Sequence, residues 1–276
     1  MVVWFFAVWT PVVCVPLDAA DAAAFEARVF EDGAGGQLPY QLLSPVDSRP
    51  GQKYPLVMFF HGAGERGADN QKQLKHGARS FLKAQQEFPC YVLVPQCPAG
   101  SQWVNMSWGA ASGVQPAAPA ESMRLALALL DTLEKQLPVD GDRIYVTGIS
   151  MGGYATWDVI TRFPERFAAA VPVCGGGDEA VAARAKGVPL WAFHSDDDNV
   201  VKVIRSRNMI AALRAAGGSP HYTEYHGLFH EAWNGTYAEP GLFPWLFAQR
   251  LGQPDRAEAK STFPPVLPNA RPGAAR

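Results

Sequence analysis

The chain has 276 residues, of which 48% are hydrophobic and 18% charged, so it is long and apolar enough to bury a large core. This composition excludes a chain that is disordered throughout. The 24 Lys and Arg residues nearly balance the 26 Asp and Glu residues, which gives a formal charge of -2. Nucleic acid is therefore not expected as a partner, because no strong positive field is present to attract phosphate groups.

The first 24 residues differ from the rest of the chain. Residues 2–17 are almost wholly apolar but are interrupted by Thr10, Pro11 and Pro16. A spanning helix needs about 20 apolar residues, so we expect no stable membrane span. Small residues at 20–22 fit a cleavage site, so residues 1–24 are expected to be a secretory leader of a secreted or periplasmic protein. Because no Lys or Arg precedes the apolar run, an N-terminal extension of a cytoplasmic protein stays as the alternative.

Strand and helix patterns alternate between residues 25 and 251. An opening antiparallel pair is expected around residues 28–30 and 38–43, with a final strand over 221–226. Continuous apolar runs, typical of buried parallel strands, lie at 55–60, 91–94, 144–146, 168–173 and 190–193. Helical spacing is found at 71–84, 122–136, 152–162, 200–216 and 242–251. The alternation predicts one α/β domain with a mostly parallel sheet flanked by helices. Residues 252–276 carry Pro, Ala and charges without periodicity and are expected to be a disordered tail.

A nucleophile motif follows the strand expected at 144–146. The sequence there is Gly-Ile-Ser-Met-Gly-Gly, with Ser150 at its centre, and a helical stretch begins directly after it. This is the strand, sharp turn and helix that a GxSxG serine requires, because the strained turn leaves room only for small neighbours. A serine hydroxyl also needs a base, and the base needs an acid to orient it; in this arrangement the chain order is Ser, acid, His.

The expected acid lies in the cluster Asp196, Asp197 and Asp198, which immediately follows the apolar strand at 190–193. Aspartates are also good turn formers and helix caps, so one is expected to be catalytic and the others to be caps. Spacing alone leaves all three open.

The expected base must follow the acid in the chain. That order excludes His61, His76 and His194. His230 lies on a loop after the last expected strand, where a mobile base belongs, and His226 is the reserve candidate.

A glycine-rich loop follows the strand at 55–60 and begins with His61 and Gly62. In hydrolases of this design such a loop supplies one oxyanion-hole NH, and the residue after the nucleophile supplies the other. We assign these donors to Ala63 and Met151. Glu65 and Arg66 are expected to brace the loop as an ion pair, with orientation of substrate as the alternative.

These motifs resemble those of serine esterases of the α/β-hydrolase superfamily, most closely the branch of feruloyl-type and polysaccharide-associated esterases, phospholipase/carboxylesterase relatives and predicted peptidases. The matching segments are FFHGAGERGADNQKQLKHG, VPQCP, GISMGGYATW, FHSDDDNVV and GLFHEAW. The resemblance implies the α/β-hydrolase fold. The family pattern His-Gly-x-x-Asp-x-x-Val selects Asp198 as the acid, with Ser195 standing where the family has Gly. It also places the family's histidine and a nearby Trp at His230 and Trp233.

Three tryptophans are candidate substrate-binding residues. Trp103 and Trp108 lie in a loop rich in small residues after the strand at 91–94, and Trp233 lies close to the expected base. The loop would lie at the carboxyl side of the sheet and wall the substrate site. The alternative is that these rings simply pack beneath the loop.

The sequence thus predicts a cofactor-free and metal-free carboxylic ester hydrolase that works through an acyl-enzyme on Ser150. No Cys/His cluster has zinc spacing, and no long amphipathic lid is present. Short-chain or aryl esters, of feruloyl or acetyl type, are expected as substrates, either small or linked to a polysaccharide. A serine peptidase of the same fold and a non-catalytic binding module are the alternatives.

Overall fold

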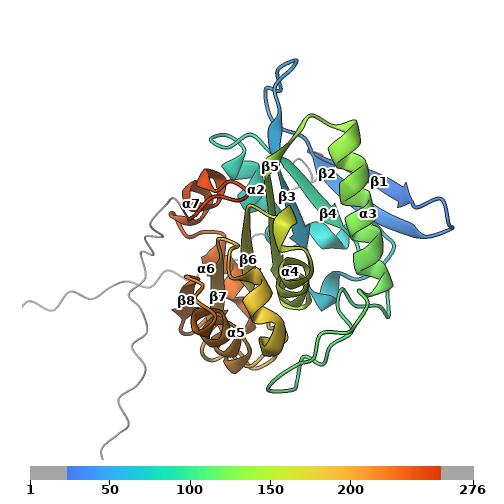
Figure 1. The fold of residues 1–276 in the computed structure, drawn as a ribbon. Coiled ribbons are helices and arrows are strands. Elements are labelled where there is room, and N and C mark those ends of the chain that lie inside the picture. Colours follow the sequence, from blue (N-terminus) through green and yellow to red (C-terminus); the bar gives the residue numbers. More distant parts are fainter. Residues whose placement is uncertain (1–23, 256–276) are drawn as a thin grey trace, which may run out of the picture.

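The computed structural model describes residues 24–255, and a single eight-stranded sheet runs through them (Figure 1). Its spatial order is β1-β2-β4-β3-β5-β6-β7-β8. The pairs β1–β2 and β2–β4 are antiparallel and all other pairs are parallel, which confirms the predicted mostly parallel α/β sheet. The strands are β1 (Phe25–Glu31), β2 (Gln37–Leu43), β3 (Tyr54–Phe60), β4 (Tyr91–Pro95), β5 (Val139–Ile149), β6 (Ala169–Val173), β7 (Trp191–Ser195) and β8 (His221–Tyr225).

The central strands are buried on both faces, because side chains of successive residues point to opposite sides of the sheet. In β3, where all seven residues are buried, Leu56 and Met58 join one core cluster, and Val57 and Phe59 join the other. Continuous apolar runs are therefore needed here, as the sequence indicated.

Helices cover both faces of the sheet (Figure 1). The first core cluster takes apolar side chains from α3 (Glu121–Gln136), α4 (Met151–Arg162) and α5 (Ile204–Ala215). The second takes them from α2 (Ala78–Ala84), α6 (Ala232–Thr236) and α7 (Leu242–Ala248). Short 3-10 helices lie at Ala63–Glu65, Lys72–Leu74, Pro164–Arg166, Glu179–Ala185 and Phe229–Glu231. Over residues 24–255, none of the helices has the length and apolar character needed to cross a membrane.

Two expected helices begin later than predicted. The helix expected at 71–84 is divided, because Gly77 adopts a left-handed φ of 82° between a 3-10 turn and α2. The helix expected from residue 200 begins at Ile204. The reason is that the Asp198 carboxylate accepts the backbone NH groups of Val200 and Val201, which holds this segment in a turn.

The two ends of the chain lie largely outside the described residues. The expected leader over 1–24 and most of the expected tail fall there. The tail prediction began too early, since Asp255 still contacts the domain: its carboxylate pairs with His221 and accepts from the Gln249 amide.

Candidate active site

Ser150 forms the sharp turn between β5 and α4. Its φ of 54° and ψ of -116° are unusual for a residue with a side chain, and such strain persists only where the surroundings fix it. Its backbone NH donates to the Val173 carbonyl at 2.9 Å. The flanking glycines are required by close packing: a Cβ on Gly148 would lie 2.4 Å from the Gly152 carbonyl oxygen, and one on Gly152 would lie 1.9 Å from that of Phe60.

A continuous hydrogen-bonded chain joins Ser150, His230 and Asp198, which are far apart in the sequence. The Ser150 Oγ lies 2.8 Å from His230 Nε2, and His230 Nδ1 lies 2.7 Å from Asp198 Oδ2. Because a carboxylate only accepts, Nδ1 carries a proton, and in the neutral ring Nε2 is then free to accept the serine proton. The Asp198 side chain is fully buried, whereas that of His230 keeps 18% of its surface exposed. This arrangement can activate the Ser150 hydroxyl as a nucleophile at the carboxyl end of β5.

The Asp198 carboxylate is fully engaged. Its Oδ1 accepts the NH groups of Val200 and Val201, and its Oδ2 receives His230 and lies 3.2 Å from Nε2 of the buried His194. Burial acts to raise the pKa of Asp198, but the hydrogen bonds from His194, His230 and the backbone outweigh it and hold that pKa well below its usual value. The acid is therefore ionised throughout the neutral range.

The neighbouring aspartates have different partners from those expected. Asp196 pairs with Nδ1 of the exposed His226 at 2.9 Å, so the reserve candidate His226 does not reach Ser150 in this structure. Asp197 accepts the NH groups of Gly227 and Phe229. Neither side chain is seen to cap the helix that follows. Asp197 binds the backbone just before His230, whereas the Asp196 side chain pairs with the exposed ring of His226.

The glycine-rich loop lies against the nucleophile. A Cβ built on Gly62 would be 3.6 Å from the Ser150 Cβ, so Gly62 lies against the serine, and Ala63, the next residue, begins the following 3-10 helix. Met151 is the first residue of α4. Both residues assigned as oxyanion donors thus begin helical turns beside Ser150, and backbone NH groups at such positions are free to bind an anion.

The ring of His61 holds the glycine-rich loop in place through two hydrogen bonds. Its Nδ1 lies 2.6 Å from the Gly62 carbonyl and must donate, so its Nε2 accepts the backbone NH of Cys97 at 2.9 Å. Burial lowers the pKa of His61 to about 4, which keeps the ring neutral as these contacts require. The Trp103 Nε1 donates to the His61 carbonyl at 3.2 Å.

Glu65 and Arg66 do not form the expected ion pair with each other. The Arg66 guanidinium donates to the carbonyls of Ala63 and Ser101 and lies 6.0 Å from the ring centre of Trp108. The carboxylate of Glu65 is buried beside Gly62, and burial raises its pKa. Arg66 therefore braces the loop through two carbonyl groups and not through an ion pair with Glu65.

The three tryptophans have different surroundings. Trp103 is fully buried against Phe60 and His61, so it has no surface to offer a substrate, and its assignment to the pocket wall is wrong. Trp108 is half-buried on the loop after β4. Trp233 is mostly buried, and its ring stands edge-on to that of His230 at 5.5 Å between centroids.

Several supporting residues were not identified from the sequence. Chain order excluded His61 and His194 from the role of base, and both instead brace the loop and the acid. Their position at the carboxyl ends of β3 and β7 was the available indication. Within residues 24–255, Cys174 joins His194 and Asp198 in one group, and His226 joins Asp196 and Asp197 in another, close enough to hold a metal ion. The histidine of each group already has protein partners, as does Asp198 in the first group. The expected absence of a metal stays a prediction.

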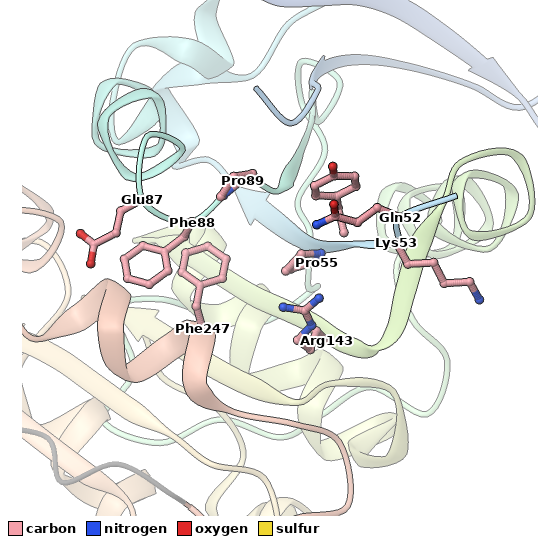
Figure 2. A pocket seen from close by; sticks show the side chains of 9 residues that line it. Gln52, Lys53, Pro55, Glu87, Phe88, Pro89, Arg143 and Phe247 are labelled. Carbon is pink, nitrogen blue, oxygen red and sulfur yellow. The ribbon is translucent and has the colours of Figure 1, made fainter. Parts of the chain in front are cut away.

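A shallow pocket lies at the opposite end of the sheet, by the amino ends of β3 and β4 (Figure 2). It is lined by Gln52, Lys53, Tyr54, Pro55, Glu87, Phe88, Pro89, Arg143 and Phe247. The nucleophile elbow is at the carboxyl end of β5, so this pocket is separate from it.

Comparisons with known proteins agree with the α/β-hydrolase fold. The model of the prolyl oligopeptidase family matches residues 121–182. The crystal structure of a thermostable esterase is 40% identical, with a TM-score of 0.77, over 84% of this chain and 64% of that chain. Dipeptidyl-peptidase 5 of Porphyromonas gingivalis is 28% identical over 58% of this chain and 22% of the relative. A bifunctional acetylxylan esterase/xylanase of Neocallimastix patriciarum is 31% identical over 26% of this chain and 11% of the relative. The chain therefore spans less than a quarter of the length of these two curated relatives.

Proposed function

We propose that this chain, which belongs to the α/β-hydrolase superfamily, is a serine hydrolase of carboxylic esters. The observation that carries the proposal is the unbroken chain of hydrogen bonds from Ser150 through His230 to Asp198 on a strained turn. In the proposed reaction His230 Nε2 takes the Ser150 proton as Oγ attacks the ester carbonyl. Asp198, ionised and fixed, stabilises the imidazolium that forms.

The negative charge of the tetrahedral intermediate is held by the backbone NH groups of Ala63 and Met151. His230 then returns its proton to the leaving alcohol, and the acyl group remains on Ser150. His230 then takes a proton from a water molecule as its oxygen attacks the acyl carbon, and returns that proton to the Ser150 Oγ as the acyl–serine bond breaks and the acid leaves. Each step uses only side chains and backbone of this chain, so the proposed reaction needs no cofactor.

Short-chain or aryl esters are the proposed substrates. Support comes from the exposed Phe229, which directly precedes His230, and the half-buried Trp108, whose ring lies 6.0 Å from the guanidinium of Arg66 in the glycine-rich loop; both offer flat apolar surface. The alcohol or acid would be small or linked to a polysaccharide. Secretion remains a proposal that rests on the apolar N-terminal residues.

A serine peptidase is the second candidate, since the matched prolyl oligopeptidase model covers the nucleophile segment and one relative is a dipeptidyl-peptidase. The ester proposal is preferred because the most extensive sequence likeness reported above, 40% over 84% of this chain, is to an esterase.

The test compares the wild type with Ser150→Ala on p-nitrophenyl acetate, p-nitrophenyl butyrate, a longer p-nitrophenyl ester, methyl ferulate and aminoacyl p-nitroanilides. We expect turnover of the short and aryl esters by the wild type alone, and labelling of Ser150 alone by a fluorophosphonate. Faster cleavage of the anilides would favour the peptidase. Equal rates for wild type and Ser150→Ala, or an unlabelled and inert wild type, would exclude the proposed mechanism.

A further inference from the structure

Three consecutive backbone NH groups in front of His230 are bound by two side chains at the end of β7. The NH of Gly227 donates to Asp197 Oδ2 at 3.1 Å, that of Leu228 to Ser195 Oγ at 3.3 Å, and that of Phe229 to Asp197 Oδ1 at 3.0 Å. The Ser195 hydroxyl in turn donates to Asp197 Oδ1 at 2.5 Å. The two side chains therefore act as one unit, and every donor and acceptor in it is matched.

The bound segment has a backbone conformation that it would not adopt unaided. Phe229 has φ of 48°, in the left-handed region, where a bulky residue is an outlier that persists only when its surroundings enforce it. The residue is 58% exposed, so core packing does not hold it there. The hydrogen bond from its NH to Asp197 is the restraint that acts directly on this residue. Because His230 is the next residue, the conformation of Phe229 determines where the imidazole begins.

We propose that Ser195 and Asp197 form a positioning pair that fixes His230 by binding the backbone of residues 227–229. The inference rests on the proposed function, in which His230 is the base. Asp198 alone would let the imidazole ring rotate, since it contacts the ring through one hydrogen bond from Nδ1. Fixing the backbone in front of the ring removes this freedom, and a small displacement of a catalytic group lowers the rate steeply.

Ser195 occupies the position at which the sequence departs from the family pattern. Its side chain reaches the strand next to it as well, since its Oγ lies 3.4 Å from the Tyr225 carbonyl. It is fully buried at the point where β7 ends. The serine in this chain thus adds a contact that a glycine could not make.

Asp197→Asn is the main test, because it keeps the shape and changes the bonding. Whichever way the amide is oriented, its NH2 group faces the NH of either Gly227 or Phe229, so one donor meets another donor. We expect kcat on p-nitrophenyl butyrate to fall about 10- to 100-fold with KM within about twofold, since Asp197 itself contacts no substrate in the proposed reaction. Ser195→Ala, which loses one neutral hydrogen bond, should lower kcat by about 2- to 10-fold.

Asp196→Asn is the matched control. It removes one negative charge from the adjacent position, but its side chain pairs with the exposed His226 and binds none of the three NH groups. Its kcat should stay within about twofold of the wild type. An equal loss in Asp196→Asn and Asp197→Asn would show that charge near His230 matters and would overturn the positioning role.

A second background tests the strain directly. Glycine adopts a positive φ without a penalty, so Phe229→Gly should reduce the need for the restraint. We expect Asp197→Asn to lower kcat at least threefold less when combined with Phe229→Gly than when introduced alone, which a double-mutant cycle measures. Equal losses in both backgrounds would overturn the inference, as would an Asp197→Asn variant with the wild-type kcat. Should Asp197→Asn fail to fold by circular dichroism, Ser195→Ala carries the same comparison in both backgrounds.

Failure of this inference is distinguishable from failure of the proposed function. An active Ser150→Ala variant would overturn both. An inactive Ser150→Ala variant beside a fully active Asp197→Asn variant would overturn the positioning pair alone.

Discussion

The two ends of the parallel sheet differ in how their polar groups are held. At the carboxyl end, Ser150, Cys174 and Phe229 all have positive φ, although none is a residue type that favours it. The Asp197 carboxylate there accepts backbone NH groups of Gly227 and Phe229, which lie 30 and 32 residues further along the chain. At the amino end, two contacts of the residues that line the pocket in Figure 2 join side chain to side chain. Arg143 forms an ion pair with Asp140, three residues away, and the ring of Phe88 stacks on that of Phe247.

This difference separates a constrained end from a relaxed one. Backbone strain is maintained only where several contacts over-determine it, and such contacts fix side chains to within a fraction of an ångström. A hollow at the surface needs no such support. The presence of a pocket is thus a weaker indication of chemistry in this molecule than the density of side-chain-to-backbone hydrogen bonds.

The largest expected effect is loss of the base. His230→Ala should lower kcat on p-nitrophenyl butyrate by on the order of 10⁴- to 10⁶-fold, because the Ser150 proton then has no acceptor. His226→Ala is the control and should remain within about twofold, since that ring is exposed and bonded to Asp196. A large loss in His226→Ala with an active His230→Ala would reverse the assignment of the base.

The second largest effect on rate is expected when the same substitution, Asp to Asn, is made at each end of the sheet. Asp198→Asn should lower kcat by about 10⁴-fold, because an amide at this position favours the wrong imidazole tautomer. Asp140→Asn, the same substitution beside the amino-end pocket, removes an ion pair with Arg143 and should leave kcat/KM within about twofold. Steady-state kinetics of both variants on p-nitrophenyl butyrate measure these losses. Comparable losses for Asp198→Asn and Asp140→Asn would contradict the division into a constrained and a relaxed end.

Close backbone packing at the elbow predicts an effect on stability. Gly152→Ala places a methyl group 1.9 Å from the Phe60 carbonyl oxygen, so backbone must move and the free energy of unfolding should fall by about 1–3 kcal/mol or more. A Cβ on Gly109 meets nothing within 4 Å, so Gly109→Ala should change this free energy by less than about 0.5 kcal/mol. Urea unfolding of both variants measures the difference, and similar midpoints would show that the elbow can relax.

The smallest predicted effect depends on pH and concerns Glu65. Burial raises its pKa above the usual 4.5, so the folded protein holds the proton more tightly than the unfolded chain. Its contribution to stability is present below pH 4.5 and is lost as the pH rises through the higher folded-state value. Glu65→Gln removes the ionisation, so it should raise Tm relative to the wild type at pH 8 but not at pH 4.

The matched change for Glu65 is Glu87→Gln, at an exposed carboxyl group of the amino-end pocket. Thermal unfolding of this variant should show the same difference from the wild type at both pH values. A gain for Glu65→Gln that is independent of pH would contradict burial of an ionisable carboxyl beside Gly62.

The sequence by itself determined the strand order along the chain, the α/β class and the position of Ser150. These are local properties: an apolar run or a glycine-flanked serine has its meaning within about ten residues. Chain order and loop position also indicated His230, and the resemblance selected Asp198; the structure brings both to Ser150.

Only the tertiary structure decided what the residues around them do. Trp103 looked like a pocket residue but is buried, and Asp197 looked like a turn former or helix cap but, together with Ser195, binds the segment before His230. His61 and His194, set aside by chain order, brace the loop and the acid. These roles depend on hydrogen bonds between segments about 30 residues or more apart in several cases, and such pairings are fixed by the packing of the sheet, not by any local pattern.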